Sequence, residues 1–374
     1  MYHIGNNSLT NINKKHYSTM FCKTLLTACV IISSACMQAQ ENGGQQRPPY
    51  HPRTTTNPDV HDPVMAKGED GLYHIFSTGM GVSEMTSADM KTWNIQPAVL
   101  STIPAWAIDS IRGYRGHTWA PDISYHNGQW LLYYSCSTFG KNGSAIGLAT
   151  NKTLDAKSPD YQWTDQGPVI ISHQRKDQYN AIDPNLIVDS HGTPWLTFGS
   201  FWDGIQMVRL KKDFKTLDGK PFTISRRTGR KITLDELNNV ENYTIEGNDT
   251  IEAGSNAVEA PFIIKNGKYY YLFVSFDYCC RGERSTYRTV VGRSKKVTGP
   301  YVDSKGQPMA KGGGDTLIGP NAEYFGAGHN AAYQFDGQWY FISHAYVKAE
   351  NGRAKLLIRK MSFNADGWPV LNHM

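Results

Sequence analysis

Three acidic residues and one histidine stand at the heads of short apolar stretches, and their types and spacing suit them to chemistry. They are Asp62 in His-Asp-Pro, Asp183 in Ile-Asp-Pro, Glu259 in Glu-Ala-Pro and His329 in Gly-His-Asn. A carboxylate beside a stretch that must be buried costs free energy unless it has a partner or a function. Turn capping explains a single Asp-Pro, but heads of this kind in four places favour one shared site.

This set of side chains has four chemical interpretations. It suits a metal site, or glycoside hydrolysis, in which an acid and a base flank the scissile bond. It also suits a binding protein whose acids only form hydrogen bonds with sugar hydroxyls, and structural capping of turns. The residues alone disfavour only the last of these.

The elements that position the four heads repeat five times. In each repeat a short apolar run precedes a polar turn with glycine and then an aromatic and β-branched run, which is the pattern of a β-hairpin. The turn glycines are Gly71, Gly128, Gly192, Gly267 and Gly337. Third strands are predicted in four repeats, over 145–150, 204–210, 289–294 and 355–361. Five such units predict an all-β fold, a five-bladed β-propeller, whose first strands line a central channel and bring their heads to one mouth.

Two further features bear on the site. In the second repeat Ala120 stands at the head and Asp122 follows two residues later, so Asp122 is left open between a site residue and a structural one. Trp202 lies in the turn-like Ser-Phe-Trp-Asp-Gly, where stacking on a sugar ring is favoured over core packing. Core packing is expected instead for Trp130, Trp195 and Trp339.

The chain divides into three parts. Residues 1–39 carry lysines, a short apolar stretch and then small residues, which is typical of a secretory signal peptide. Cleavage after Ala39 and lipid attachment at Cys36 are both possible, so the protein is expected to be secreted or periplasmic, with lipoprotein anchoring as an alternative. Residues 40–57, rich in Gly, Gln, Pro and Thr, predict a flexible tether. Residues 58–374 predict a single domain, and no segment is long and apolar enough to span a membrane.

Charge and cysteine content exclude some classes of protein. Without residues 1–39 the formal charge falls from +5 to +2, with 35 basic and 33 acidic residues and no basic block, so nucleic acid is not an expected partner. Cys136, Cys279 and Cys280 remain, an odd number with no regular spacing, and this excludes a disulfide framework. Cys136 is expected to be a small buried residue, and the adjacent Cys279 and Cys280 are candidates for a vicinal bridge.

Taken together and in order, the motifs of residues 58–374 resemble glycoside hydrolase family 43, and within it the endo-arabinanases. The motifs that carry the resemblance are His61-Asp62-Pro63, Trp119-Ala-Pro-Asp122, Ser137-Thr-Phe-Gly140, Asn180-Ala-Ile-Asp183, Phe198-Gly-Ser-Phe-Trp202, Glu259-Ala-Pro-Phe, Phe276-Asp-Tyr-Cys-Cys-Arg-Gly282 and Gly328-His-Asn330. Each motif alone is weak, but the ordered set is specific.

The resemblance implies an inverting hydrolysis of α-1,5-linked L-arabinan, the side chain of pectin, by a monomer. Asp62 would be the general base, Glu259 the general acid, and Asp183 would orient the acid and tune its pKa. His329 would face a Ca²⁺ ion, mostly through waters. Substrate contacts would fall on Asp62, Gly140, Asn180, Ala181, Ile182, Asp183, Ser200, Phe201 and Trp202. An exo-acting arabinofuranosidase or xylosidase of the same family, and a non-catalytic arabinan-binding propeller, stay open as alternatives.

Overall fold

The computed structural model describes residues 53–227 and 256–372, and the expected signal peptide with Cys36 lies outside them. The described chain is almost entirely β-strand, with one short α-helix, α1 (Ala105–Ser110), and three single-turn 3₁₀ helices. Residues 53–57, expected to belong to the tether, are part of the fold. Strand β1 (Thr54–Thr55) pairs with β6 (Trp93–Ile95), with Thr54 opposite Asn94.

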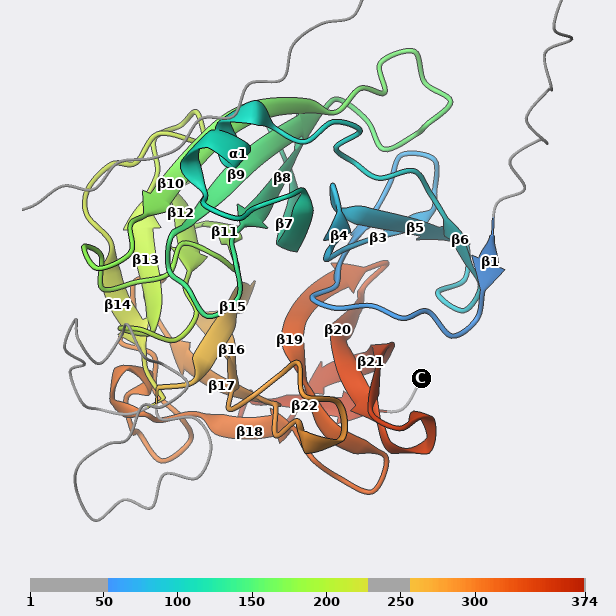
Figure 1. The fold of residues 1–374 in the computed structure, drawn as a ribbon. Coiled ribbons are helices and arrows are strands. Elements are labelled where there is room, and N and C mark those ends of the chain that lie inside the picture. The colour runs from blue at the N-terminus through green and yellow to red at the C-terminus, as the bar shows by residue number, and fades with distance from the viewer. Residues whose placement is uncertain (1–52, 228–255, 373–374) are drawn as a thin grey trace, which may run out of the picture. The chain divides into compact units, whose positions relative to one another are not determined.

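The strands of the described residues form four sheets, which follow one another in chain order in Figure 1. The first contains β1, β6, β5 (Ser83–Ser87), β3 (Tyr73–Ser77) and β2 (Val64–Lys67). The second contains β10 (Thr164–Ser172), β9 (Ser144–Asn151), β8 (Gln129–Cys136), β7 (His117–His126) and β4 (Gly79–Met80). The third contains β11 (Asn185–Val188), β12 (Pro194–Phe198), β13 (Ile205–Arg209) and β14 (Phe222–Ser225).

The fourth sheet has eight strands and consists of two antiparallel halves. The first half contains β15 (Val258–Asn266), β16 (Tyr269–Phe276), β17 (Arg288–Ser294) and β18 (Asp315–Ile318). The second half contains β19 (Tyr324–Phe335), β20 (Gln338–Val347), β21 (Arg353–Phe363) and β22 (Pro369–Asn372). A single parallel pair, Arg288 opposite Ala327, joins the two halves.

The five predicted hairpins are present, and all five turn glycines have a positive φ, which glycine adopts without strain. The four predicted third strands are β9, β13, β17 and β21. The first repeat has a third strand too, β5, which the sequence analysis missed. Its sequence, Ser-Glu-Met-Thr-Ser, has a single apolar residue, whereas each of the other four strands has at least two.

The first strands of the repeats contact one another in succession. β2 contacts β7, β7 contacts β11, β11 contacts β15, β15 contacts β19, and β19 contacts β2. The segment before β2 also pairs with the last repeat, because Val60 N–H donates to Ala354 O at 3.3 Å and Leu356 N–H to Pro58 O at 3.1 Å. Residues from the two ends of the described fold therefore lie side by side.

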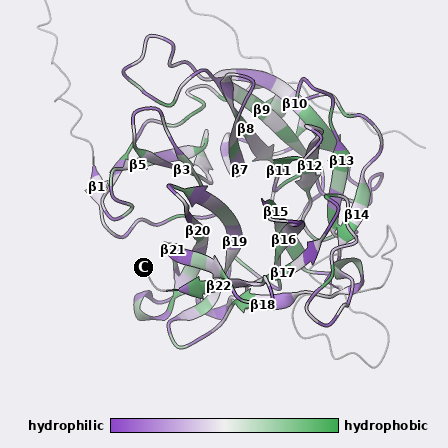
Figure 2. Cartoon of the chain, turned by 180° about the vertical axis from the view of Figure 1, so that it is seen from behind, coloured by the Kyte–Doolittle hydropathy of each residue, from purple (hydrophilic) through white to green (hydrophobic). Residues whose placement is uncertain are grey.

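Apolar side chains fill the space between neighbouring sheets. The largest cluster joins residues of the first two sheets to β15, β16 and β19, and includes the buried Phe76, Tyr134 and Phe273. In Figure 2 the hydrophobic colour gathers on the strands, while the connecting loops are mostly hydrophilic. Packed strands of this kind hold the heads of the first strands in fixed positions. No helix in the described part of the chain is long and apolar enough to cross a membrane.

Candidate active site

One cavity of about 590 Å³ collects the residues that the sequence analysis selected. The predicted residues that line it are Asp62, Gly140, Asn180, Ile182, Asp183, Ser200, Phe201, Trp202, Glu259 and His329. Ala181 does not line it, because its side chain is fully buried in an apolar cluster with Leu186 and Phe198. The three acids and the histidine therefore meet at one place although they come from four repeats.

The backbone at the heads of the repeats has a shared feature that the sequence analysis did not foresee. Asp62, Ala120, Asp183, Ala260 and His329 all have a positive φ, between 36° and 57°. For residues other than glycine this conformation costs about 1–3 kcal/mol each and is often found at functional sites. The residue of the fourth repeat that has the same backbone conformation as Asp62 and Asp183 is Ala260. Placing Glu259 at the head of that repeat was therefore wrong by one residue. The proline that follows the first four of these residues could have revealed the register.

Asp62 is held by hydrogen bonds at both carboxylate oxygens. His329 Nδ1 lies 3.0 Å from Oδ1, and the Thr78 hydroxyl donates to Oδ2. Thr78 is itself fixed, since its oxygen accepts the Ala120 N–H at 2.9 Å. Burial alone would raise the pKa of the Asp62 carboxyl, but the facing charge and hydrogen bond of His329 lower it below its ordinary value. Asp62 is therefore ionised at neutral pH, and its side chain remains 18% exposed.

A second histidine, His344, holds the strained backbone of Asp62 by a hydrogen bond. Asp62 N–H donates to His344 Nδ1 at 3.1 Å, so His344 carries its proton on Nε2, which lies 3.2 Å from Tyr346 Oη. Burial, followed by the charge of His61, lowers the pKa of His344 well below its usual range, in agreement with a neutral ring. His344 and Tyr346 lie two residues apart on β20, so both point to the same side of the strand. Neither residue was predicted from the sequence, although this spacing on a strand is a signal that could have identified them.

Glu259 also has both oxygens occupied, by two neutral donors. Ser200 Oγ donates to Oε2 at 2.7 Å and Tyr287 Oη donates to Oε1 at 2.8 Å. Burial, and then the charge of Glu259, raise the pKa of the Tyr287 phenol, so Tyr287 keeps its proton as a donor. The Ser200 hydroxyl can also accept a hydrogen bond, so the same contact can hold a protonated Glu259 that donates to it.

Asp183 lies next to Glu259 and accepts a hydrogen bond from Ala260, the residue that follows Glu259. Ala260 N–H donates to Asp183 Oδ2 at 3.1 Å, and Asp183 N–H donates to Ser135 Oγ at 3.0 Å. Burial raises the pKa of the Asp183 carboxyl well above its ordinary value, and the nearby charges of Glu259 and Asp62 raise it further, while His329 opposes them. In the folded protein the Asp183 carboxyl therefore loses its proton less readily than an ordinary carboxyl.

His329 is poorly arranged to coordinate a cation directly. Its Nδ1 faces Asp62, whose charge, against the opposing effect of burial, raises the pKa of His329 to about 9. In the described ranges no three His, Cys, Asp or Glu side chains converge to hold a metal ion. The neighbouring Asn330 is 3% exposed, and its side-chain oxygen and nitrogen have no partner. The site therefore fits a cation held through water near His329, but not one held by a shell of protein ligands.

A family model for the glycosyl hydrolases family 43 matches residues 53–369. The chain belongs to glycosyl hydrolase family 43. This agrees with the resemblance found in the motifs and covers nearly all of the described fold.

Several relatives are similar to this chain over most of their length. The extracellular exo-α-(1→5)-L-arabinofuranosidase ArbA of Cellvibrio japonicus is 44% identical over 315 residues, covering 84% of this chain and 86% of the relative. The extracellular endo-α-(1→5)-L-arabinanase 1 of Bacillus subtilis is 38% identical over 318 residues, covering 84% and 88%. The crystal structure of an exo-1,5-α-L-arabinanase from a bovine ruminal metagenomic library is 61% identical, with a TM-score of 0.78, and covers 85% of this chain and 98% of that one.

Aromatic side chains line the cavity of this family 43 chain around the carboxylates. Trp202, which is only 5% exposed, lines it together with Trp119, Phe139 and Tyr278. Phe139 is 73% exposed, which is unusual for a large apolar side chain. Trp130, by contrast, is packed in the core as expected.

Asp122 has a structural role in this family 43 fold. It is 2% exposed and is not among the residues that line the cavity. Its carboxylate accepts Leu186 N–H at 2.8 Å and Asn185 Nδ2 at 3.2 Å, so it joins β7 to β11. Burial raises the pKa of Asp122 to about 7. The sequence left Asp122 open between a site residue and a structural one. Because Asp122 does not line the cavity, it is a structural residue.

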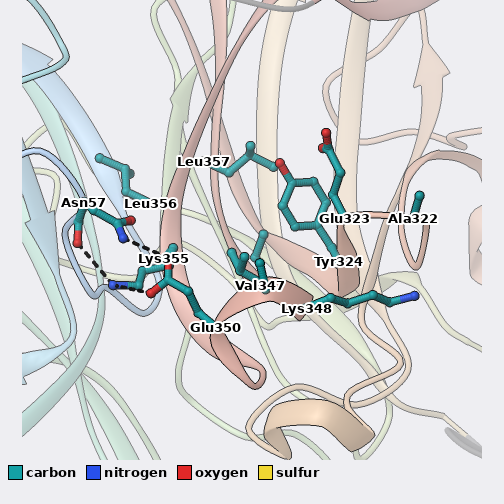
Figure 3. A pocket seen from close by; sticks show the side chains of 12 residues that line it. Asn57, Ala322, Glu323, Tyr324, Val347, Lys348, Glu350, Lys355, Leu356 and Leu357 are labelled. Carbon is teal, nitrogen blue, oxygen red and sulfur yellow. Dashed lines mark hydrogen bonds and ion pairs between the residues drawn. The ribbon is translucent and has the colours of Figure 1, made fainter.

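Figure 3 shows side chains that line a second cavity, among them Lys355, Glu350 and Tyr324. This cavity has a volume of about 510 Å³ and shares no lining residue with the first. Lys355 on its wall pairs with Asp59 at 2.8 Å and with Glu350 at 3.0 Å, and it donates to Asn57 O at 3.2 Å. Asn57 in turn donates to Glu350 at 2.8 Å. These contacts tie the segment before β2 to β21 and have no link to the carboxylate site.

Proposed function

We propose that this chain hydrolyses α-1,5-linked L-arabinan with inversion at the anomeric carbon. The observation that carries the proposal is the convergence of Asp62, Asp183 and Glu259 in one cavity lined by aromatic side chains. The names of the relatives, which act on α-1,5-linked arabinose chains, supply the substrate. A non-catalytic binding protein would have no use for carboxylates with such different electrostatic surroundings.

Asp62 suits the general base. Its interaction with His329 keeps it ionised, and its partly exposed side chain is accessible to water. A base of this kind takes a proton from the attacking water, which adds to the face of the sugar opposite the leaving group. Thr78 and His344 act as positioning residues, because they fix the side chain and the backbone of Asp62 respectively.

Glu259 suits the general acid, with Asp183 as its neighbour. An inverting pair needs a gap of about 6.5–9.5 Å that leaves room for the water. Asp62 precedes β2 and Glu259 lies in β15, and these two strands are not neighbours in the succession of first strands. β19 lies between them on one side, and β7 and β11 on the other. Asp183 and Glu259 are neighbouring carboxyl groups that repel each other when both are ionised. Losing both protons is therefore less favourable than losing one.

We extend the proposal to the fold, as a five-bladed propeller. The succession of contacts from β2 through β7, β11, β15 and β19 back to β2 supports it. So does the single parallel pair between Arg288 and Ala327, because the eight-stranded sheet divides naturally at this point into two four-stranded blades. The positive φ at five equivalent heads gives the same count.

Endo attack is the prediction from the motifs, and exo attack is a second candidate. The second candidate is favoured because the relatives at 44% and 61% identity are both named exo-acting, whereas the one at 38% is named endo-acting. Purified protein should be incubated with linear arabinan and with dye-cross-linked arabinan, and product sizes followed over time. Endo attack releases soluble dye and a ladder of oligosaccharides from the start. Exo attack releases one short product and no dye, and a lack of any product contradicts the proposed function itself.

A hydrated cation, Ca²⁺ by family resemblance, is proposed beside His329. Bound there, it would supply positive charge near the carboxylates, which line the same cavity as His329. Exhaustive chelation is expected to lower both activity and melting temperature, with recovery on adding back Ca²⁺. Full activity in a preparation shown to be metal-free by elemental analysis would contradict a role for the ion.

The proposed setting is that of a secreted monomer acting on polysaccharide. The relatives from Cellvibrio japonicus and Bacillus subtilis are both named extracellular, which supports secretion. No basic block is present that would suit nucleic acid.

A further inference from the structure

Two adjacent free cysteines, Cys279 and Cys280, line the same cavity as the three carboxylates. Cys280 is exposed and Cys279 is partly buried beside Tyr287 and Tyr346. The vicinal bridge considered from the sequence is not formed, and the mechanism proposed above uses neither thiol. This pair of nucleophilic groups in the cavity wall has no assigned role.

The backbone that carries the pair is held in place. Cys280 has a φ of 61°, and its N–H donates to Tyr346 Oη at 2.7 Å. Tyr346 Oη also lies 3.9 Å from Cys280 Sγ and 3.3 Å from His61 Nε2. The cysteine turn is therefore connected through Tyr346 and His344 to the backbone of Asp62. A group bound to the sulfurs would stand beside the general base and its supports.

Cys279 and Cys280 are consecutive residues that line one cavity, but their sulfurs are poorly suited to a direct bond. A hydrogen bond between the thiols, and then burial, raise the pKa of Cys279 well above its usual value. Consecutive Cα atoms are only about 3.8 Å apart, whereas disulfides usually join Cα atoms about 4.4–6.8 Å apart. A direct S–S bond would therefore be strained. A larger atom that bonds to both sulfurs avoids that strain. Once this atom is bound to one sulfur, the other sulfur reacts with it within the same molecule, at a high effective concentration.

We propose that Cys279 and Cys280 form a dithiol site for trivalent organoarsenicals, and that filling it blocks the substrate cavity. In the reaction with an arsine oxide, each thiol loses its proton and two As–S bonds form. The arsenic oxygen leaves with the two protons as water, so arsenic stays trivalent and nothing is oxidised or reduced. Only the second half of the proposal, the loss of activity, rests on the proposed function.

The shape of the cavity favours an aromatic substituent on the arsenic. Phe201 and Tyr278 line the same cavity, with ring centroids 5.8 Å apart, and the Arg281 guanidinium lies 3.7 Å from the centre of the Tyr278 ring. These planar surfaces next to the cysteines offer apolar contact to a phenyl group. Phenylarsine oxide is therefore the appropriate probe.

The test treats the full-length mature protein with phenylarsine oxide and reads the intact mass and arabinan hydrolysis in parallel. We expect the mass to rise by one phenylarsenic group less two hydrogens, with activity lost in proportion to the labelled fraction. A dithiol such as 2,3-dimercaptopropanol should reverse both changes, and excess monothiol should not. Cys279→Ser and Cys280→Ser should each abolish the labelling that resists monothiol, and Cys136→Ala, in the apolar core, should leave it unchanged.

The two halves of the proposal fail separately. No stable adduct, or an adduct that survives in both single serine variants, overturns the dithiol site. A complete adduct on an enzyme that keeps its activity overturns the blockage of the cavity. If the untreated protein has no activity on arabinan, the proposed function fails, and the mass measurement still tests the site.

Discussion

Glu259→Ala and Asp62→Ala are each expected to reduce arabinan hydrolysis by about 10²–10⁴-fold, the usual contribution of a general acid or base. Both carboxylates line the cavity and are held by side-chain donors, Ser200 and Tyr287 at Glu259 and Thr78 at Asp62. Removal of either carboxylate takes away a proton-transfer step, but leaves the aromatic walls that bind the substrate. The loss should therefore appear mainly in kcat, measured by reducing-sugar release at saturating arabinan.

The two variants should differ on a substrate with an activated leaving group, such as an aryl α-L-arabinofuranoside. An aryl group departs without a proton, so Glu259→Ala should recover part of its activity on this substrate. Asp62→Ala should not recover, since the attacking water still needs its base. Recovery of Asp62→Ala instead would mean that the two roles are reversed. Asp336→Asn, a change at an exposed carboxylate paired with Lys67 outside the cavity, is the matched control and should behave like the unaltered enzyme.

Asp183→Asn is expected to lower activity and to raise stability at neutral pH. Burial and the neighbouring carboxylates raise the pKa of Asp183 on folding, so the folded protein holds this proton more tightly than the unfolded chain. Stability from this group is therefore present below the unfolded pKa, near 4, and is lost as the pH rises towards the folded pKa. Asparagine does not ionise, and it keeps an oxygen that can accept the Ala260 N–H. The advantage of the variant in melting temperature should grow from pH 4 to pH 8.

The activity of Asp183→Asn should fall between that of the unaltered enzyme and that of Glu259→Ala. Without the neighbouring carboxylate, the general acid loses its proton more readily, so the alkaline limb of the pH–rate profile should move to lower pH. A melting-temperature difference that is the same at pH 4 and pH 8 would contradict the raised pKa. An unchanged alkaline limb would contradict the assignment of Asp183 as the neighbour that tunes the acid.

Much of the fold was predictable because each hairpin is encoded locally. The turn glycines and the aromatic second strands gave the five repeats, and the polar heads gave the carboxylates and the histidine of one cavity. The third strand of the first repeat was missed because β5 is polar, and only its packing against β3 and β6 makes it a strand. The order of residues 53–57 was missed for a similar reason, since β1 is fixed by pairing with β6 and Asn57 by contacts with Lys355 and Glu350.

The contacts that support the site were not predictable because they join residues far apart in the sequence, although the spacing of His344 and Tyr346 was an available signal. His344 accepts the Asp62 N–H although the two residues lie 282 positions apart in the sequence. Tyr287, just before β17, donates to Glu259 in β15. No local pattern marks Tyr287 as a donor to a carboxylate. The sequence left Asp122 open between a site residue and a structural one, and only the packing of β7 against β11 directs its carboxylate to backbone and amide donors.

The central claim is that water activated by Asp62 attacks the face of the sugar opposite to the bond that Glu259 protonates. The most direct test is proton NMR of the reducing end released from an α-1,5-arabino-oligosaccharide, recorded in the first moments of the reaction, before mutarotation. The account predicts that the β-anomer of the new reducing sugar appears first and then equilibrates. Initial release of the α-anomer would show retention and would contradict the assignment of a general base and a general acid to these two carboxylates.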